Sequence, residues 1–334
     1  MGRLMDQKAS IAESGPPSAP AAVRPADLVP AATLKALHRR TNWQGLVHIT
    51  LQLAALAGSG ALIWLARGTW WLLPAMFVHG VQMVFLFGAH HECVHQSPFR
   101  SKWIGTGLNF VLGLILFYPP KYLWHFHMTH HRHTQDPALD PEIAVPLPTT
   151  RASYLWFALG PPYWRRRLQT SLRHALTGKA GQPFIPERDK SAIVREARQI
   201  WLIYLGAAIG TAFIDPWILP LYWLGPAVLG QPALRLYQIM EHGGAAFGDQ
   251  PFRNARTLTT NPVMRWYHWN MPYHAEHHLF PNVPFHALPK LRPYLLEQLE
   301  VVEPGYVAGN LRYWRALGEN ALPRTDTDPP LKPA

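Results

Sequence analysis

The sequence contains little cysteine and little charge. Cys93 is the only cysteine among 334 residues, which excludes an internal disulfide, a CxxC zinc knuckle and a cysteine-ligated iron–sulfur cluster within this chain. Charged residues make up 15% of the chain and hydrophobic residues 48%. The GxGxxG fingerprint of dinucleotide binding and the His-Pro-Gly-Gly motif of the cytochrome b5 kind are also missing. A redox reaction would therefore need electrons from a separate protein.

The basic residues indicate a membrane protein rather than a nucleic-acid reader. The formal net charge is +11, but the basic residues flank apolar runs instead of forming one stripe. Cytoplasmic loops of membrane proteins carry such residues, and the many Trp, Tyr and Phe suit the membrane interface. We expect a membrane partner and no nucleic acid. The flanking residues include Arg39, Arg40, Arg67, Arg165, Arg166, Arg167, Arg195 and Arg198.

Apolar runs predict an all-α, multi-pass transmembrane helical bundle. Residues 46–66 and 70–88 approach the ~20 residues that a membrane span needs. Residues 103–118 are shorter and predict a re-entrant or interfacial segment. The run at 200–230 is split by Asp215-Pro216, which predicts two short spans and brings the expected total to about four. The membrane domain covers residues 41–315, between an Ala/Pro-rich tail at 1–40 that we expect to be disordered and a Pro-rich tail at 316–334.

Eighteen histidines stand out, and many of them are clustered. On a helix, at about 100° per residue, His91 and His95 share a face, and His130 and His131 lie on either side of His127. A third cluster repeats the latter spacing, and one histidine follows the last apolar run. The candidate metal ligands are His91, His95, His127, His130, His131, His242, His274, His277 and His278. His125 and His133 point away from the ligand face of the second cluster and are expected to serve other purposes or none. The histidines isolated in the chain are expected to be structural: His38, His48, His79, His174 and His286.

Nine imidazoles are too many for one metal ion, whereas two ions with four or five ligands each can use them all. Imidazole binds iron, zinc and copper similarly, so the ligand type alone leaves the metal open. Polar residues near each cluster are candidates to orient the imidazoles through their second ring nitrogen. These candidates are Glu92, Asp136, Asp140, Glu241, Asn270 and Glu276.

The order of the clusters resembles the three histidine boxes of the membrane fatty-acid desaturase and hydroxylase family. The HxxxH spacing of His91 and His95 is similar to the first box. The second box resembles His127-Met-Thr-His130-His131 with its acidic sequel up to Glu142, and the third resembles His274-Ala-Glu-His277-His278. His242 stands where many members carry a further ligand. Some members space the first box by four residues, which makes His90 an additional candidate. The resemblance covers roughly residues 40–315.

This resemblance implies a site for two iron ions, held by a helical cap on the cytoplasmic face, with O₂ as co-substrate. It implies a desaturase that introduces a double bond into a fatty-acyl or related lipid chain. Electrons would come from a ferredoxin- or cytochrome b5-like donor with its reductase. A lipid or carotenoid hydroxylase or ketolase of the same family is the alternative. The basic residues between 151 and 198 likewise predict that the histidines face the cytoplasm.

Two other classes of protein fit parts of the pattern. Residues 91–95 match HExxH, in which two histidines bind zinc and Glu92 would be the general base of an intramembrane protease. That interpretation leaves both HxxHH clusters unused. A metal transporter or sensor is the other alternative, but transporters usually bury ionisable groups within their spans, whereas these clusters follow the ends of the spans.

Overall fold

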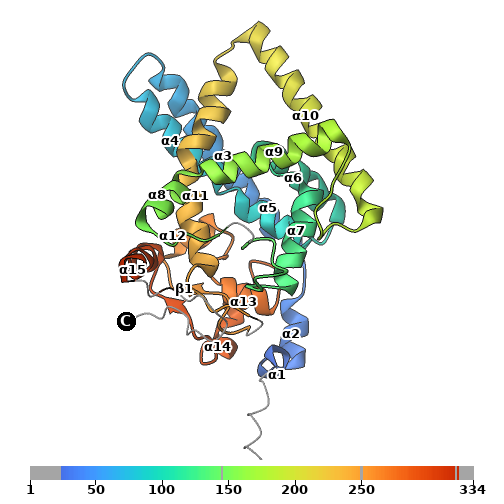
Figure 1. Ribbon diagram of the computed structural model, residues 1–334, viewed down its shortest axis with the longest axis vertical. Coiled ribbons are helices and arrows are strands. Elements are labelled where there is room, and N and C mark those ends of the chain that lie inside the picture. Colours follow the sequence, from blue (N-terminus) through green and yellow to red (C-terminus); the bar gives the residue numbers. More distant parts are fainter. Residues whose placement is uncertain (1–23, 144–145, 249–250, 320–321, 323–334) are drawn as a thin grey trace, which may run out of the picture.

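The computed structural model in Figure 1 describes residues 24–143, 146–248, 251–319 and 322. Within these residues the chain is mostly helical, as expected. Two strands of two residues each, β1 (Thr257–Leu258) and β2 (Val302–Glu303), form one short parallel pair. The first helices are α1 (Pro25–Leu28), α2 (Ala31–Leu37), α3 (Trp43–Ala66), α4 (Leu72–Val84), α5 (Phe87–Val94), α6 (Lys102–Ile115) and α7 (Pro120–Arg132). They are followed by α8 (Arg151–Leu159), α9 (Pro161–Thr177), α10 (Glu187–Ile214), the π-helix η1 (Pro220–Leu224) and α11 (Gly225–His242). The last are α12 (Pro262–Tyr267), α13 (His274–Leu279), the 3₁₀-helix η2 (Leu288–Lys290), α14 (Arg292–Leu295) and α15 (Tyr306–Glu319).

Three helical segments are long and apolar enough to cross a membrane: α3, α4 together with α5, and α10. The 24 residues of α3 extend about 36 Å, which exceeds the ~30 Å thickness of bilayer hydrocarbon. Large apolar side chains such as Leu51, Leu65 and Phe213 are exposed on these helices. In a bilayer such side chains face lipid instead of water, so their exposure fits an integral membrane protein.

The segment predicted to be re-entrant or interfacial is bent sharply. Helices α6 and α7 meet at 98°, and together they form either a broken span or a re-entrant loop. Between them, Phe117 has a positive φ of 55° and Pro119 precedes the first residue of α7. Since proline cannot donate a backbone hydrogen bond, it suits the first turn of the new helix. Because of this bend, the axis of α7, which carries three of the candidate histidines, runs in a different direction from the axis of α6.

The two short spans predicted within residues 200–230 differ from the observed helices. Helix α10 starts at Glu187, inside the basic stretch between 151 and 198, and its 28 residues are enough for one span. It ends at Asp215-Pro216, where the sequence predicts a break, and Arg67 forms an ion pair with Asp215 at 2.7 Å. The returning half consists of η1 and α11. By length and composition, α11 is not among the candidate spans in the described residues.

Helix α11 packs closely on α4 because glycines face each other at their crossing. A methyl group added at Gly80 would overlap the carbonyl of Pro226, and one added at Gly230 would overlap the backbone of Gly80. Small residues allow membrane helices to approach at this distance. The crossing holds α11, which ends at His242, against α4.

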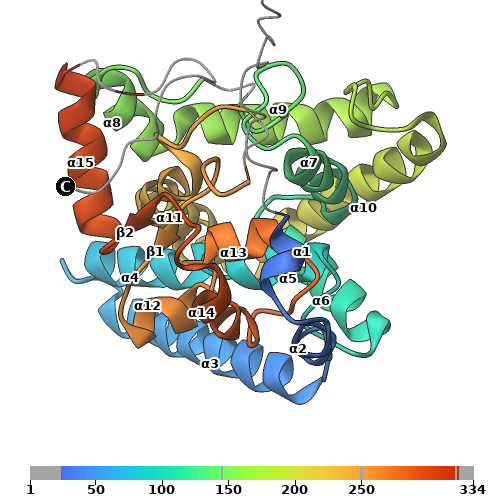
Figure 2. The same cartoon turned by 90° about the horizontal axis from the view of Figure 1, so that it is seen from below.

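The remaining elements gather at one end of the molecule, as seen from below in Figure 2. They include β1, β2, α12 to α15 and the first two helices. Buried Arg256 and half-buried Arg312 both form ion pairs with Glu303 in this region. The described part of the segment expected to be a disordered tail forms α1 and α2, with Val29 and Leu37 buried in the core. The rest of that segment and most of residues 316–334 lie outside the described residues, although α15 continues to Glu319.

Candidate metal centre

Four helical segments bring the nine candidate histidines together next to the apolar helices. Helix α5 supplies His91 and is followed at once by His95. Helix α7 supplies three histidines, α11 ends at His242, and α13 supplies three more. The local helical spacing is therefore as expected for all three clusters. Each of the nine side chains is buried or half-buried.

The nine imidazoles form two groups, and in each group the nitrogens lie within 4.8 Å of one another. The five-histidine group contains His91, His95, His127, His131 and His277. The four-histidine group contains His130, His242, His274 and His278. Both HxxHH clusters are divided between the groups, a partition that helical spacing alone did not indicate.

Within each group, ring nitrogens point at each other at short distance. In the five-histidine group, the Nε2 atoms of His95 and His127 are 2.8 Å apart, and that of His131 is 2.9 Å from His127. In the four-histidine group, His242 Nε2 lies 3.1 Å from His130 Nε2 and 2.8 Å from His274 Nε2.

These distances fit the ligand shell of a metal ion. A metal–imidazole bond is about 2.1 Å long, so two ligands at right angles around one ion lie about 3 Å apart. Without an ion, neutral imidazoles whose Nε2 atoms face each other have too few N–H groups to hydrogen-bond every nitrogen. Both ring nitrogens of His91 are buried with no hydrogen-bond partner. An ion in each group would use these nitrogens.

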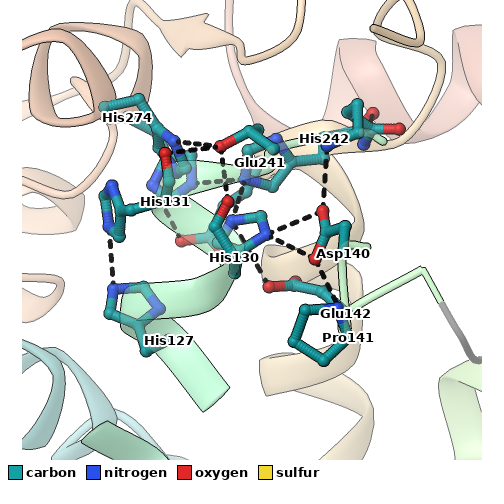
Figure 3. Close-up of polar contacts among 12 residues, drawn as sticks. His127, His130, His131, Asp140, Pro141, Glu142, Glu241, His242 and His274 are labelled. Atoms are coloured by element: carbon teal, nitrogen blue, oxygen red, sulfur yellow. Dashed lines mark hydrogen bonds and ion pairs between the residues drawn. The ribbon is translucent and has the colours of Figure 1, made fainter. Parts of the chain in front are cut away.

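Polar residues behind the four-histidine group hold its rings in place. His130 Nδ1 donates to Asp140 at 2.9 Å (Figure 3). His242 Nδ1 donates to the carbonyl of Asn254 at 2.8 Å. Glu241 lies 3.4 Å from His274 Nδ1. A hydrogen bond at Nδ1 fixes the tautomer and directs the lone pair of Nε2 inward, which is how outer partners commonly orient metal-binding histidines.

Three other predicted partners bond to groups other than the nine imidazoles. The Asp136 carboxylate accepts from the backbone of Ala138, in a turn. The Asn270 side chain donates to the carbonyl of Phe285. Glu276 accepts from Thr257 Oγ1. These residues hold the chain around the clusters rather than the imidazoles themselves.

Two further residues of the first cluster lie outside both groups. His90 Nε2 lies 3.0 Å from the carbonyl of Tyr118, and His90 is in neither group of the described residues. Glu92 Oε2 accepts hydrogen bonds from Ser97 Oγ and the backbone N–H of Phe285. The HExxH interpretation accounts for only two of the nine grouped histidines, His91 and His95.

One carboxylate beside the centre was not among the predicted site residues. Glu142 Oε2 lies 3.5 Å from His130 Nε2, on the ring edge that faces the four-histidine group (Figure 3). The acidic stretch after the second cluster was noted in the sequence, but spacing gave no reason to choose its last member. Burial raises the pKa of Glu142 above its ordinary value, and the charge of His130 opposes this shift.

Burial favours the neutral form of two imidazoles of the third cluster. Burial, together with the neighbouring histidines, lowers the pKa of both His277 and His278 well below its ordinary value. The neutral imidazole is the form that has a lone pair to offer to a metal.

Structural roles fit the isolated histidines. His48 Nε2 contacts the carbonyl of Trp266, His79 contacts Ser59, and His174 contacts Gln182. Buried His125 of α7 pairs with Asp189 of α10. Among the described residues, neither the five-histidine group nor the four-histidine group includes any of these side chains.

A cavity opens from the centre toward α9. On the metal side it reaches His91, His127, His130, His242 and His274. The walls include the aromatic residues Phe87, Tyr118, Tyr122 and Phe126. A substrate in this cavity would contact the edge of both histidine groups, with most water excluded from that edge by the aromatic rings.

Comparison with known proteins gives one consistent result. Residues 68–309 match the family model described as fatty acid desaturase. The chain is 27% identical over 278 residues to the sphingolipid delta(4)-desaturase/C4-monooxygenase DES2 of Homo sapiens, covering 78% of this chain and 76% of that protein. It is 24% identical to the sphingolipid delta(4)-desaturase DES1 of Drosophila melanogaster, covering 75% and 73%, and 22% identical to the dihydrorhizobitoxine desaturase of Bradyrhizobium elkanii, covering 80% and 78%. The chain therefore belongs to the fatty acid desaturase family of oxidoreductases.

Proposed function

We propose that the nine histidines bind two iron ions, one in each group, and that the enzyme desaturates a lipid chain at this centre. The observation that carries the proposal is the partition of the imidazoles into two converging sets. Family membership supports iron over zinc or copper, which the ligands alone do not distinguish. Glu142 is suited to complete the four-histidine group, which has one imidazole fewer than the other.

Two iron ions would supply O₂ activation, which side chains cannot provide, for the removal of hydrogen from an unactivated carbon. The chain itself supplies position and exclusion of water. Asp140 and Asn254 hold the rings of His130 and His242, and the aromatic wall of the cavity fixes a hydrocarbon beside them. None of the nine histidines is needed as a general base in this reaction.

The substrate we propose is a fatty-acyl or related lipid chain, and desaturation is the main reaction. Two of the similar proteins named above carry sphingolipid desaturase in their names. Hydroxylation is the second candidate, because the human relative is named both a desaturase and a C4-monooxygenase. Both reactions begin with removal of one hydrogen from the same carbon, so one cavity serves either.

An external redox protein would deliver electrons at a second, polar hollow on the other side of the centre. His131 and His278 line it and are half-buried, unlike most of the nine histidines. Arg132, His133 and Asp136 also line it. We propose that Arg132 pairs with an acidic donor such as a ferredoxin or a cytochrome b5-like protein. We propose that this face, with the helical cap, lies in the cytoplasm, because basic residues are abundant between 151 and 198.

Metal analysis of the purified protein and lipid analysis of a host with and without the gene test the proposal together. We expect about two irons per chain, and a product two hydrogens lighter or one oxygen heavier than its precursor. The His38→Ala variant is the control, because His38 bonds only the carbonyl of Leu34 within α2. A single metal per chain, or an unchanged lipid profile from an iron-loaded protein, would contradict the proposal.

A further inference from the structure

The wall of the cavity opposite the histidines is basic. Helix α9 lies across the molecule between α10 and α11 (Figure 1), and one of its faces lines the cavity. That face spans three turns at the spacing of a single helical stripe. It consists of Pro162, Tyr163, Arg166, Arg167, Thr170, Ser171 and His174.

Helix α9 carries arginines on both of its sides. Arg165 and Arg173 are exposed on the outer side, whereas Arg166 and Arg167 line the cavity and are half-buried. A third half-buried arginine, Arg235 on α11, lines the same wall. Three guanidinium groups facing one cavity give its wall a positive charge that a hydrocarbon tail alone does not use.

These arginines have spare hydrogen-bonding capacity. Arg235 donates to Gln238 at 2.7 Å, but its Nε is buried with no partner. Arg166 reaches only the carbonyl of Pro141, at 3.3 Å. Arg167 stacks on Tyr118 and reaches one carbonyl at 3.4 Å. Each guanidinium has five N–H donors, so most of them are available to a ligand.

No carboxylate of the described residues lies within 4 Å of these three guanidinium groups. Glu142 and Glu241 line the same cavity, and their negative charges act on Arg235 from a greater distance. Both carboxylates are closer to the histidine side, at 3.5 Å from His130 and 3.4 Å from His274. The cavity is therefore acidic beside the metal centre and basic on the opposite wall.

We propose that Arg166 and Arg235 bind an oxyanion of the substrate, a carboxylate or a phosphate, while the chain attached to it reaches the histidines. This rests on the proposed function, because it assumes that the same cavity holds the substrate. Arginine is suited to the task because its planar fork matches both oxyanions. Arg167 contributes charge and closes the wall through its stacking on Tyr118 and Tyr163.

The position of Arg235 limits how far the acidic group lies from the carbon that reacts. Arg235 and His242 are seven residues apart on α11, which corresponds to about 10 Å along the helix axis. The acidic group and the oxidised carbon are thus held within one short cavity. The substrate is an acidic lipid that reacts near its head group, and its remaining tail extends away from the arginines.

Binding of matched amphiphiles tests this inference without turnover. The probes are decanoate, decyl phosphate and the neutral decanamide, added to iron-loaded protein in nanodiscs without an electron donor. We expect an anionic probe to bind at least about tenfold more tightly than decanamide, since a hydrogen bond to a charged group typically changes affinity by that factor or more. Whichever of decanoate and decyl phosphate binds more tightly identifies the oxyanion as a carboxylate or a phosphate.

Arg166→Gln and Arg235→Gln should each weaken binding of the anionic probe about tenfold and leave the affinity for decanamide unchanged. Arg165→Gln is the matched control, because Arg165 is exposed and outside the cavity. Equal binding of decanamide and both anions to the wild type, or unchanged anion affinity in both variants, would overturn the inference. If one variant fails to fold, the other and the wild-type comparison still decide it. Iron is measured on the same samples. Missing iron would contradict the proposed function. Iron-loaded protein that binds the anionic and neutral probes equally well would contradict this inference alone.

Discussion

His130 and His131 are neighbours in the sequence, yet their rings serve different groups of imidazoles. The two ring centroids are 5.8 Å apart with planes at 67°. His131 Nε2 faces His127 and His277, whereas His130 Nε2 faces His242. Helix α7 therefore lies between the two groups and contributes to both, and α13 does the same with His277 and His278.

This relationship predicts that single histidine variants remove one metal ion and not both. His131→Ala takes a ligand from the five-histidine group, and His130→Ala takes one from the four-histidine group. Each should lower the iron content from about two to about one per chain and abolish turnover, because the reaction needs both ions. Iron analysis with a single-turnover assay measures the two effects. His38→Ala should retain both irons, and loss of both irons from each site variant would argue against independent groups.

The carboxylate of Asp140 should strengthen metal binding through His130 rather than by contact with the ion. Asp140→Asn removes the charge that faces His130 Nδ1 while it preserves the side-chain shape. Such outer partners are typically worth 10–100-fold in metal affinity, so one iron should be extracted by a chelator at about tenfold lower concentration. Asp136→Asn is the matched control, since Asp136 bonds only backbone amides of its own turn. Equal chelator sensitivity of the two variants would refute the role of Asp140.

Arg132 should assist the electron donor without affecting the centre. Its side chain is exposed at the rim of the polar hollow that His131 and His278 line. Arg132→Glu should slow turnover with an acidic redox protein several-fold, with a stronger effect at low salt, because surface charges mainly steer association. Turnover driven by a chemical reductant should be unchanged. Arg173→Glu alters an exposed charge on the outside of α9 and serves as the control. The same loss with a chemical reductant would assign Arg132 to the centre instead.

The close crossing of α4 and α11 should be sensitive to a single methyl group. Gly80→Ala and Gly230→Ala each place a carbon against the backbone of the other helix. Overpacking of this kind typically costs about 1–3 kcal/mol, so the melting temperature in detergent should fall. Because the crossing positions His242, iron retention should fall with it. Gly107→Ala is the control, since no atom lies within 4 Å of the added carbon on α6. Unchanged stability of both crossing variants would show that the helices can separate without cost.

The sequence alone indicated the nine histidines of the candidate centre and their local helical spacing. Spacings of three and four residues place histidines on one helical face whatever the rest of the chain does, because the α-helix has a fixed period. The count of nine imidazoles indicated two metal ions before any helix was placed. The apolar run at 46–66 indicated a span for the same local reason, since length and composition suffice to cross a bilayer.

The division of those histidines between the two groups, and the residues that surround them, depend on the tertiary structure. The helical period does not specify which other helix packs against a given face. The assignment of His130 and His131 to different groups therefore depends on where α11 and α5 are placed. The choice of Asp140 over Asp136 depends on a turn of the chain, and Glu142 approaches His130 only after that turn. The basic wall of the cavity arises because α9 folds back over the centre, a contact between segments far apart in the chain that no local pattern specifies.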